Sequence, residues 1–181
     1  MKRSGLLDAR DDSTAPMDIV PSTIIPGTFA AYLWKNVVIA TWFRPLSMAE
    51  LPQFEAGCKA RCAEHPEGMS VINIMVPGGK SMPTAEARAE LGRIMREYEA
   101  FSAEVAVIIP GDGFWASALR GLITALSMLA PRYRLRIAGN FLEVAEYLPE
   151  PHRQRTGVTI DPKELLRALR WVESQVSAVA A

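Results

Sequence analysis

A glycine, a lysine and a serine in a row, Gly79-Lys80-Ser81, stand between a predicted strand and a predicted helix. This is the place of a P-loop, where backbone N–H groups and a lysine cradle the phosphates of a nucleotide. The complete motif has another glycine about five positions earlier, and this sequence has Ile74 there. The missing glycine argues against nucleotide hydrolysis by this loop and leaves Lys80 as a candidate contact for an anion.

The segment 111–116, Gly-Asp-Gly-Phe-Trp-Ala, matches the G-x-G-x-x-A pattern of dinucleotide-binding turns. Phe114 and Trp115 are bulky where a pyrophosphate would approach, and the next predicted strand ends without an acidic residue for a ribose. We therefore do not predict a dinucleotide. The N–H groups at the start of the helix could hold a less specific anion. The candidate residues for this site are Gly111, Asp112, Gly113, Lys80 and Arg120.

Cys58, Cys62 and His65 have the spacing i, i+4 and i+7, which places them on one face of a helix. Structural zinc takes four ligands, and the other histidine, His152, falls in a predicted linker. No serine or cysteine motif accompanies the histidines, and the acidic residues form no recognisable catalytic pair. We expect no metal, no cofactor and no enzyme activity, while acid–base chemistry by scattered carboxylates stays open.

The composition is typical of a globular protein: 181 residues, of which 49% are hydrophobic and 22% charged. Twenty basic and twenty acidic residues cancel, which argues against a nucleic-acid partner and against attachment to anionic lipid by charge. No apolar run is long enough to span a bilayer, and the start of the chain lacks the apolar core of a signal peptide. Two cysteines give no disulfide framework. We predict a cytoplasmic protein without a transmembrane segment.

A buried strand at 105–109, Val-Ala-Val-Ile-Ile, is the element that positions these residues. An apolar run without polar alternation is typical of a strand covered on both faces, so we place it near the middle of a sheet. Pro110 ends the strand, and 111–113 turns the chain into a helix. Further strands are predicted at 28–33, 37–42, 71–76 and 133–137. The first two form an antiparallel hairpin, and arginines that alternate along the last mark a sheet edge.

Helix starts are predicted from capping residues. Ser47 with Glu50 has the spacing of a capping box, for a helix that ends at about residue 64. Thr84 caps a helix whose apolar stripe runs from 87 to 101. Asn140 caps a short helix, and Asp161 caps the last one.

These elements divide the chain into four parts. Residues 1–22 are polar, lack periodicity and are predicted to be disordered. Residues 28–148 form an α/β domain with a mixed sheet of about five strands and about four helices. Residues 149–161, with two prolines and a glycine, are a predicted linker. A C-terminal helix covers 162–179, and its apolar stripe either docks on the domain or pairs with a second copy.

The order of a hairpin, a helix and three strand–helix units resembles the STAS family, the domains of anti-sigma-factor antagonists and their SpoIIAA-like relatives. The resemblance covers 28–148 and is most specific at 105–148. It implies a non-enzymatic regulatory domain that binds a protein partner. In many members a serine is phosphorylated where the third strand meets the second helix, a position that offers Ser81 and Thr84 here. The family's Asp-Ser-Ser-Gly-like signature is missing, and Thr84 has the alternative role of a plain helix cap.

Two classes of function follow. The first is a STAS-like regulatory or protein-interaction module in a signalling partner-switch, forming a homodimer through its C-terminal helix. The second binds a small ligand (an anion, a nucleotide or a lipid), or is an enzyme, with its site at the 111–115 turn and the 77–81 loop. Arg120 either pairs with an anion or an acidic partner residue, or belongs to a solvated helix face. A deep cavity with converging polar groups would favour the ligand, and a shallow apolar surface would favour the partner protein.

Overall fold

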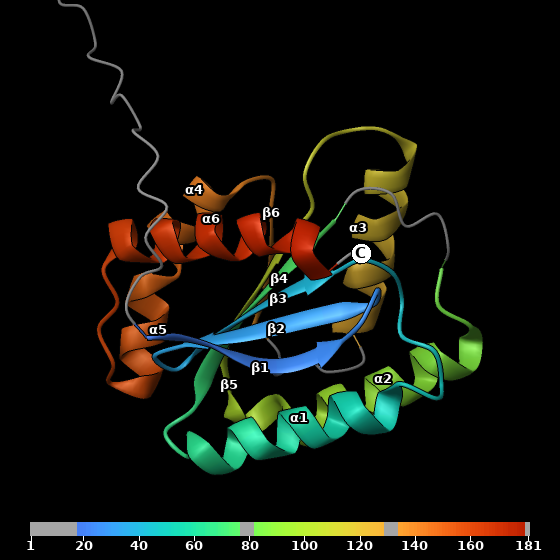
Figure 1. Cartoon of the computed structure of the whole chain (residues 1–181), viewed down its shortest axis with the longest axis horizontal. Coiled ribbons are helices and arrows are strands. Elements are labelled where there is room, and N and C mark those ends of the chain that lie inside the picture. The colour runs from blue at the N-terminus through green and yellow to red at the C-terminus, as the bar shows by residue number, and fades with distance from the viewer. Residues whose placement is uncertain (1–17, 77–81, 129–133, 180–181) are drawn as a thin grey trace, which may run out of the picture.

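The chain forms a six-stranded mixed sheet in which sequential strands are neighbours, in the order β1-β2-β3-β4-β5-β6 (Figure 1). The computed structural model describes residues 18–76, 82–128 and 134–179. β1 pairs with β2 and β2 with β3 in antiparallel fashion, and the remaining pairs are parallel. The strands are β1 Ile19–Ile25, β2 Phe29–Trp34, β3 Val37–Trp42, β4 Met69–Met75, β5 Ser102–Ile108 and β6 Leu135–Ala138.

Helices cover both faces of this sheet. α1, α2 and α3 connect successive parallel strands and lie on one face, while α4 and α6 pack on the other (Figure 1). Two neighbouring parallel strands need a long crossover connection between them, and a helix usually provides it. The helices are α1 Leu51–Glu64, α2 Ala85–Tyr98, α3 Phe114–Ser127, α4 Phe141–Tyr147, α5 Pro149–Thr156 and α6 Pro162–Val179, with a 3-10 turn at Glu99–Phe101.

The C-terminal helix belongs to the core of its own domain. Leu165, Leu169 and Val172 of α6 are fully buried in the same cluster as Ile39 and Ile72 of the sheet. This decides between the two alternatives for the apolar stripe, because these side chains are already covered. Homodimerisation stays a prediction, and it would need a surface other than these three buried side chains.

The strand predictions are confirmed in type and pairing, with one change of position. β2 and β3 form the expected hairpin, and all seven residues of β5 are buried. β5 is the fifth of six strands and therefore lies beside the edge strand β6, not in the middle of the sheet. Ile74 of β4 pairs with Ile108 of β5, so these strands are neighbours as expected.

Three helix caps predicted from the sequence are present. Thr84 Oγ1 accepts a hydrogen bond from the Ala87 N–H, and Asn140 Oδ1 accepts one from the Glu143 N–H. Asp161 Oδ1 accepts from two N–H groups in the first turn of α6.

Two segments differ from the sequence prediction. Residues 149–156 of the expected linker form α5, because Pro149 lies in the first turn, where a helix needs no N–H donor. Gly157, with a φ of 74°, ends this helix. Residues 19–22 of the segment expected to be disordered belong to β1, an edge strand that tolerates Pro21. Residues 1–17 lie outside the described part of the chain.

Candidate functional site

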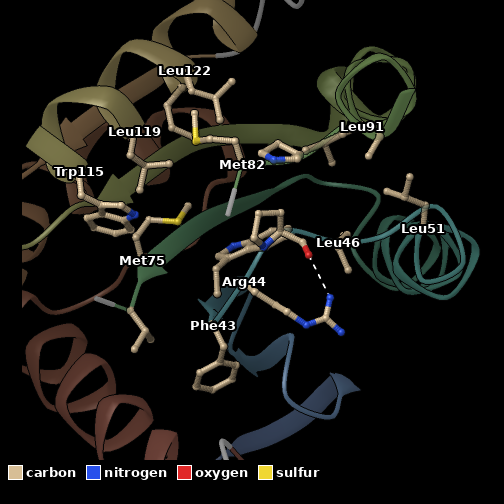
Figure 2. A pocket seen from close by; sticks show the side chains of 16 residues that line it. Phe43, Arg44, Leu46, Leu51, Met75, Met82, Leu91, Trp115, Leu119 and Leu122 are labelled. Atoms are coloured by element: carbon tan, nitrogen blue, oxygen red, sulfur yellow. Dashed lines mark hydrogen bonds between the residues drawn. The ribbon is translucent and has the colours of Figure 1, made fainter. Parts of the chain in front are cut away.

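An apolar cleft opens at the carboxyl ends of β3 and β4, between α2 and α3 (Figure 2). Its volume is about 120 Å³. Figure 2 shows Trp115, Leu119 and Leu122 of α3 on one side and Leu51 and Leu91 on the other. Among the described residues, the cleft is lined by Trp42, Phe43, Arg44, Pro45, Leu46, Leu51, Met75, Val76, Met82, Pro83, Ala87, Leu91, Trp115, Leu119, Leu122 and Ile123.

The cleft follows from where the parallel strands end. Trp42 and Met75 are register partners at the ends of β3 and β4, so both side chains reach the same edge of the sheet. Beyond β5, Gly111 and Gly113 have φ angles of 78° and 115°, which residues with a side chain rarely adopt. These glycines let the chain enter α3 at once, and Trp115 thereby reaches the cleft.

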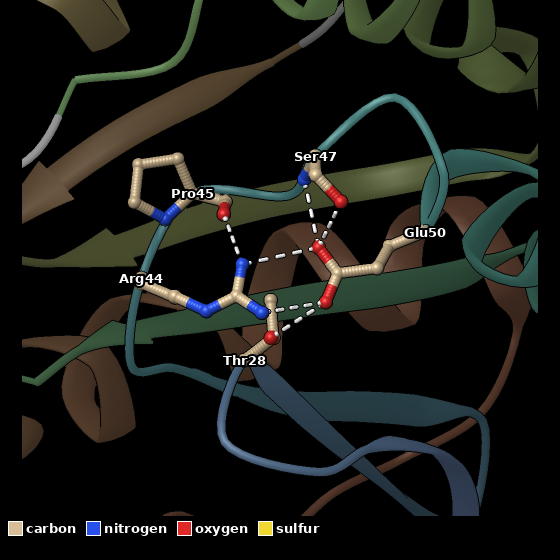
Figure 3. A network of polar contacts seen from close by, with 5 residues as sticks. All are labelled: Thr28, Arg44, Pro45, Ser47 and Glu50. Atoms are coloured by element: carbon tan, nitrogen blue, oxygen red, sulfur yellow. Dashed lines mark hydrogen bonds and ion pairs between the residues drawn. The ribbon is translucent and has the colours of Figure 1, made fainter.

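A polar network braces the rim of the cleft at the start of α1 (Figure 3). The Glu50 carboxylate accepts hydrogen bonds from Arg44 Nη2 at 2.7 Å, Thr28 Oγ1 at 2.8 Å and the Ser47 N–H at 2.8 Å. Burial alone would raise the pKa of Glu50, but hydrogen bonds from Arg44, Ser47 and Thr28 lower it to about 2.

The same network corrects the predicted capping box. The Ser47 hydroxyl donates to the Glu50 carboxylate at 2.7 Å instead of accepting a helix N–H, so only the Glu50 half of the box is formed. The helix begins at Leu51, and Pro52 lies in its first turn.

Arg120 closes the turn that was a candidate anion site. Its Nη2 donates to the backbone carbonyl of Ile109 at 3.3 Å and to that of Gly111 at 2.9 Å. The guanidinium therefore holds the end of β5 to the start of α3. Asp112 and Gly113 are exposed in the same turn, and neither lines the apolar cleft.

The remaining predicted site residues are only partly placed. Thr84 caps α2 through Oγ1, which accounts for its presence without phosphorylation. Lys80 and Ser81 lie outside the described residues.

The two cysteines line the interior between α1 and the sheet. Burial, with smaller effects of Cys62 and Glu55, raises the pKa of Cys58 to about 12, so this thiol stays protonated. His65 Nδ1 lies 3.0 Å from Glu67 Oε1 and is thus paired with a carboxylate. Within 18–76, 82–128 and 134–179, no group of three metal-ligating side chains is arranged to hold an ion.

A buried histidine network was missed by the sequence analysis. His152 Nδ1 lies 2.8 Å from Ser70 Oγ, and His152 Nε2 lies 2.9 Å from Asn36 Oδ1. Asn36 Nδ2 donates to the carbonyl of Gly68, so Oδ1 is the acceptor that faces His152 and Nε2 carries the proton. His152 and Ser70 are 0% exposed and Asn36 is 3% exposed. A serine, a histidine and an amide in contact resemble a catalytic set, but a substrate would have to reach fully buried atoms.

The network instead fastens α5 to the sheet. Burial lowers the pKa of His152 to about 4, so the ring is neutral at pH 7. In the sequence, His152 is a lone histidine inside a proline-rich segment. Its contacts with Ser70 and Asn36 cannot be inferred without the fold.

The fold and the cleft define an α/β protein with an apolar surface site. In comparisons with known proteins, no family model, no curated protein and no solved structure matches the chain. None of the helices in the described residues is long and apolar enough to cross a membrane.

Proposed function

We propose that this protein is a non-enzymatic, STAS-like interaction module that binds a partner protein through the apolar cleft. The observation that carries the proposal is the chemistry of the cleft, where Arg44 is the one charged residue among the described lining residues. The Arg44 guanidinium is already engaged by the Glu50 carboxylate and the Pro45 carbonyl. Within the described residues, the cleft therefore offers apolar contact and no group poised for catalysis.

The size and lining of the cleft favour a partner protein over a small polar ligand. Ligand pockets usually measure roughly 300–1,000 Å³ and contain a few converging polar groups, whereas this cleft measures about 120 Å³. The lining residues that the structure describes include no histidine, cysteine, acidic residue, serine or threonine. The competing anion site at the 111–115 turn is also disfavoured, because Arg120 is used to hold that turn.

Apolar side chains continue from the cleft onto the surface. Met82 lines the cleft and is 50% exposed, and Phe114, directly before Trp115, is 91% exposed. Methionine and aromatic side chains are enriched at protein interfaces and adapt to apolar partners. We infer that the partner inserts one or two apolar side chains between α2 and α3.

Phosphorylation next to the cleft could regulate binding of the partner. Thr84 directly follows the cleft residues Met82 and Pro83, and Ser81 directly precedes them. A phosphate on either hydroxyl would bring about two negative charges beside an apolar contact. Phosphorylation of Ser81 or Thr84 would then release the partner, as a partner-switch requires.

Photo-crosslinking tests the proposal. A benzophenone amino acid replaces Met82 in the cleft in one sample and Leu142 on α4 in a control, since both residues are large, apolar and about half exposed. Incubated with native cell extract, the Met82 sample should label a defined protein that the Leu142 sample does not label. That protein, once purified, should bind the wild-type chain directly. Equal labelling from both positions, or no labelling from Met82, would contradict the proposal.

The predicted homodimer is one form of this proposal, with a second copy of the chain as the partner. The mass of the full chain measured by light scattering shows whether it forms a dimer. A dimer that Leu122→Glu converts to a monomer would place the dimer contact at the cleft, and a dimer unaffected by it would place the contact elsewhere.

A further inference from the structure

A second hollow lies between the sheet and the layer of α1, α2 and α3, and we term it the inner cavity. Its volume is about 160 Å³, and all six strands contribute to its walls. Met75, Leu91 and Ile123 line both the inner cavity and the apolar cleft. The two hollows therefore adjoin behind these three side chains.

Small residues on the sheet explain why the space is unfilled. Ala31 of β2 and Ala40 of β3 face the inner cavity, where larger side chains would fill the layer. α1 approaches β1 closely at its middle, where a Cβ atom on Gly57 would lie only 2.3 Å from Thr23 Oγ1. Apolar walls around a void lose packing contacts, so an apolar occupant would restore them.

Arg61 gives this apolar space a polar end. Both Nη atoms of Arg61 pair with the Glu64 carboxylate, at 2.5 and 2.7 Å, while the buried Nε has no hydrogen-bond partner within the described part of the chain. Arg61 is the charged residue among the described lining residues, and Ser22 and Thr23 border the cavity with it. A buried N–H without an acceptor is unfavourable, and an oxygen atom of a ligand would satisfy it.

A ligand carboxylate is compatible with the existing Arg61–Glu64 pair. In the same layer, Arg93 lies at 2.7 to 2.8 Å from the carboxylates of Glu55, Glu90 and Glu97. One guanidinium of this protein thus already serves several carboxylates, and its planar donors suit that role. The other lining residues that the structure describes are uncharged, since burial raises the pKa of both lining thiols, Cys58 and Cys62.

We propose that the inner cavity binds a single-chain carboxylate of medium length, with the chain between sheet and helices and the carboxylate on Arg61 Nε. An apolar cavity of about 150 Å³ in another protein binds benzene. Scaled from that case, the two adjoining hollows hold on the order of ten carbon atoms. A ten-carbon chain extends from the inner cavity past Met75, Leu91 and Ile123 into the cleft. The proposal does not rest on the partner protein, because Arg61, which holds the carboxylate, lines the inner cavity and not the cleft.

Calorimetry with decanoate and decanol separates the chain from its head group. Both are used below their aggregation limits with the full-length protein. Decanoate should bind saturably with one site, about tenfold or more tightly than decanol, because only the carboxylate forms a charge-assisted hydrogen bond with Arg61. No saturable binding, or equal affinity for both molecules, would overturn the proposal.

Two substitutions locate the site. Arg61→Met should weaken decanoate about tenfold and leave decanol unchanged, while Arg170→Met, at an exposed arginine on α6, should change neither. Cys62→Phe fills the cavity and should weaken both ligands about tenfold or more. Decanoate binding that survives Arg61→Met or Cys62→Phe would overturn the proposed site.

Methionine methyl NMR of the wild-type chain gives a readout that needs no variant. The signals of Met69 and Met95, which line the inner cavity, should shift on addition of decanoate. The signal of Met48, which is 46% exposed and lines neither hollow, should stay in place. Shifts at Met48 without shifts at Met69 and Met95 would mean surface adsorption and would overturn the proposal.

Discussion

The buried His152 network should make the stability of the protein depend on pH well above the range in which carboxylates titrate. The pKa of His152 falls from 6.5 to about 4 on folding, so the unfolded chain binds a proton more readily than the folded one. Its contribution is complete above pH 6.5 and is lost as the pH falls through that value towards 4. From pH 7.5 to pH 5 the free energy of unfolding should drop by about 2 kcal/mol through this residue alone.

Urea unfolding of the wild type and of His152→Gln between pH 7.5 and 5 measures this effect. The variant cannot titrate, so its stability should fall by about 2 kcal/mol less than that of the wild type over this range. A second variant, His152→Leu, leaves Ser70 Oγ and Asn36 Oδ1 without partners and should lower stability by about 2–5 kcal/mol at pH 7.5. If the wild type and His152→Gln lose the same free energy of unfolding over this pH range, the claim that His152 is neutral in the folded protein is wrong.

Three further substitutions, each measured by urea unfolding, test the hydrogen-bond network of Glu50, the 111–113 turn and the C-terminal helix α6. Glu50→Gln should lower stability by about 1–3 kcal/mol at pH 7. The difference should vanish as the pH falls from 4.5 to about 2, because a depressed pKa contributes only while the folded carboxylate is charged; a difference that persists at pH 2 would contradict this. Arg120→Met removes the donor to the Ile109 and Gly111 carbonyls and should lower stability by about 1 kcal/mol; unchanged stability would mean that the turn is held otherwise. Leu169→Ala should lower stability by about 2–5 kcal/mol without altering the mass measured by light scattering, and a loss of mass with unchanged stability would mean that α6 is an assembly element.

The elements that the sequence predicted are those whose residues carry their own local signal. The apolar run of β5, the Thr84 cap of α2 and the Asp161 cap of α6 each depend on a few neighbouring residues. α5 was missed because its two prolines were interpreted as breakers, although both lie in the first turn. β1 was missed because Pro21 and the polar residues beside it hide the alternation of an edge strand.

The candidate site was harder to predict because it is built from segments far apart in the chain. The sequence predicts ordinary core positions for Met75, Leu91 and Leu119. Only the fold brings these residues together in one cleft. The sequence did predict that the segments after β4 and β5 meet at one sheet edge, and Trp115 does line the cleft there. The sequence could not show that the Arg120 guanidinium donates to two backbone carbonyls, since these hydrogen bonds depend on the path of the 111–113 turn.

The affinity of the cleft for its partner is the most direct test of the central claim. The protein labelled from Met82 is purified, and its binding to the wild type, Leu122→Glu and Leu142→Glu is compared by calorimetry, with circular dichroism to confirm folding. A charge placed among the apolar lining at Leu122 should weaken binding about tenfold or more, whereas the same change at the exposed Leu142 should leave it unchanged. Equal affinities of the folded Leu122→Glu and Leu142→Glu variants would contradict the claim that the apolar cleft is the binding site.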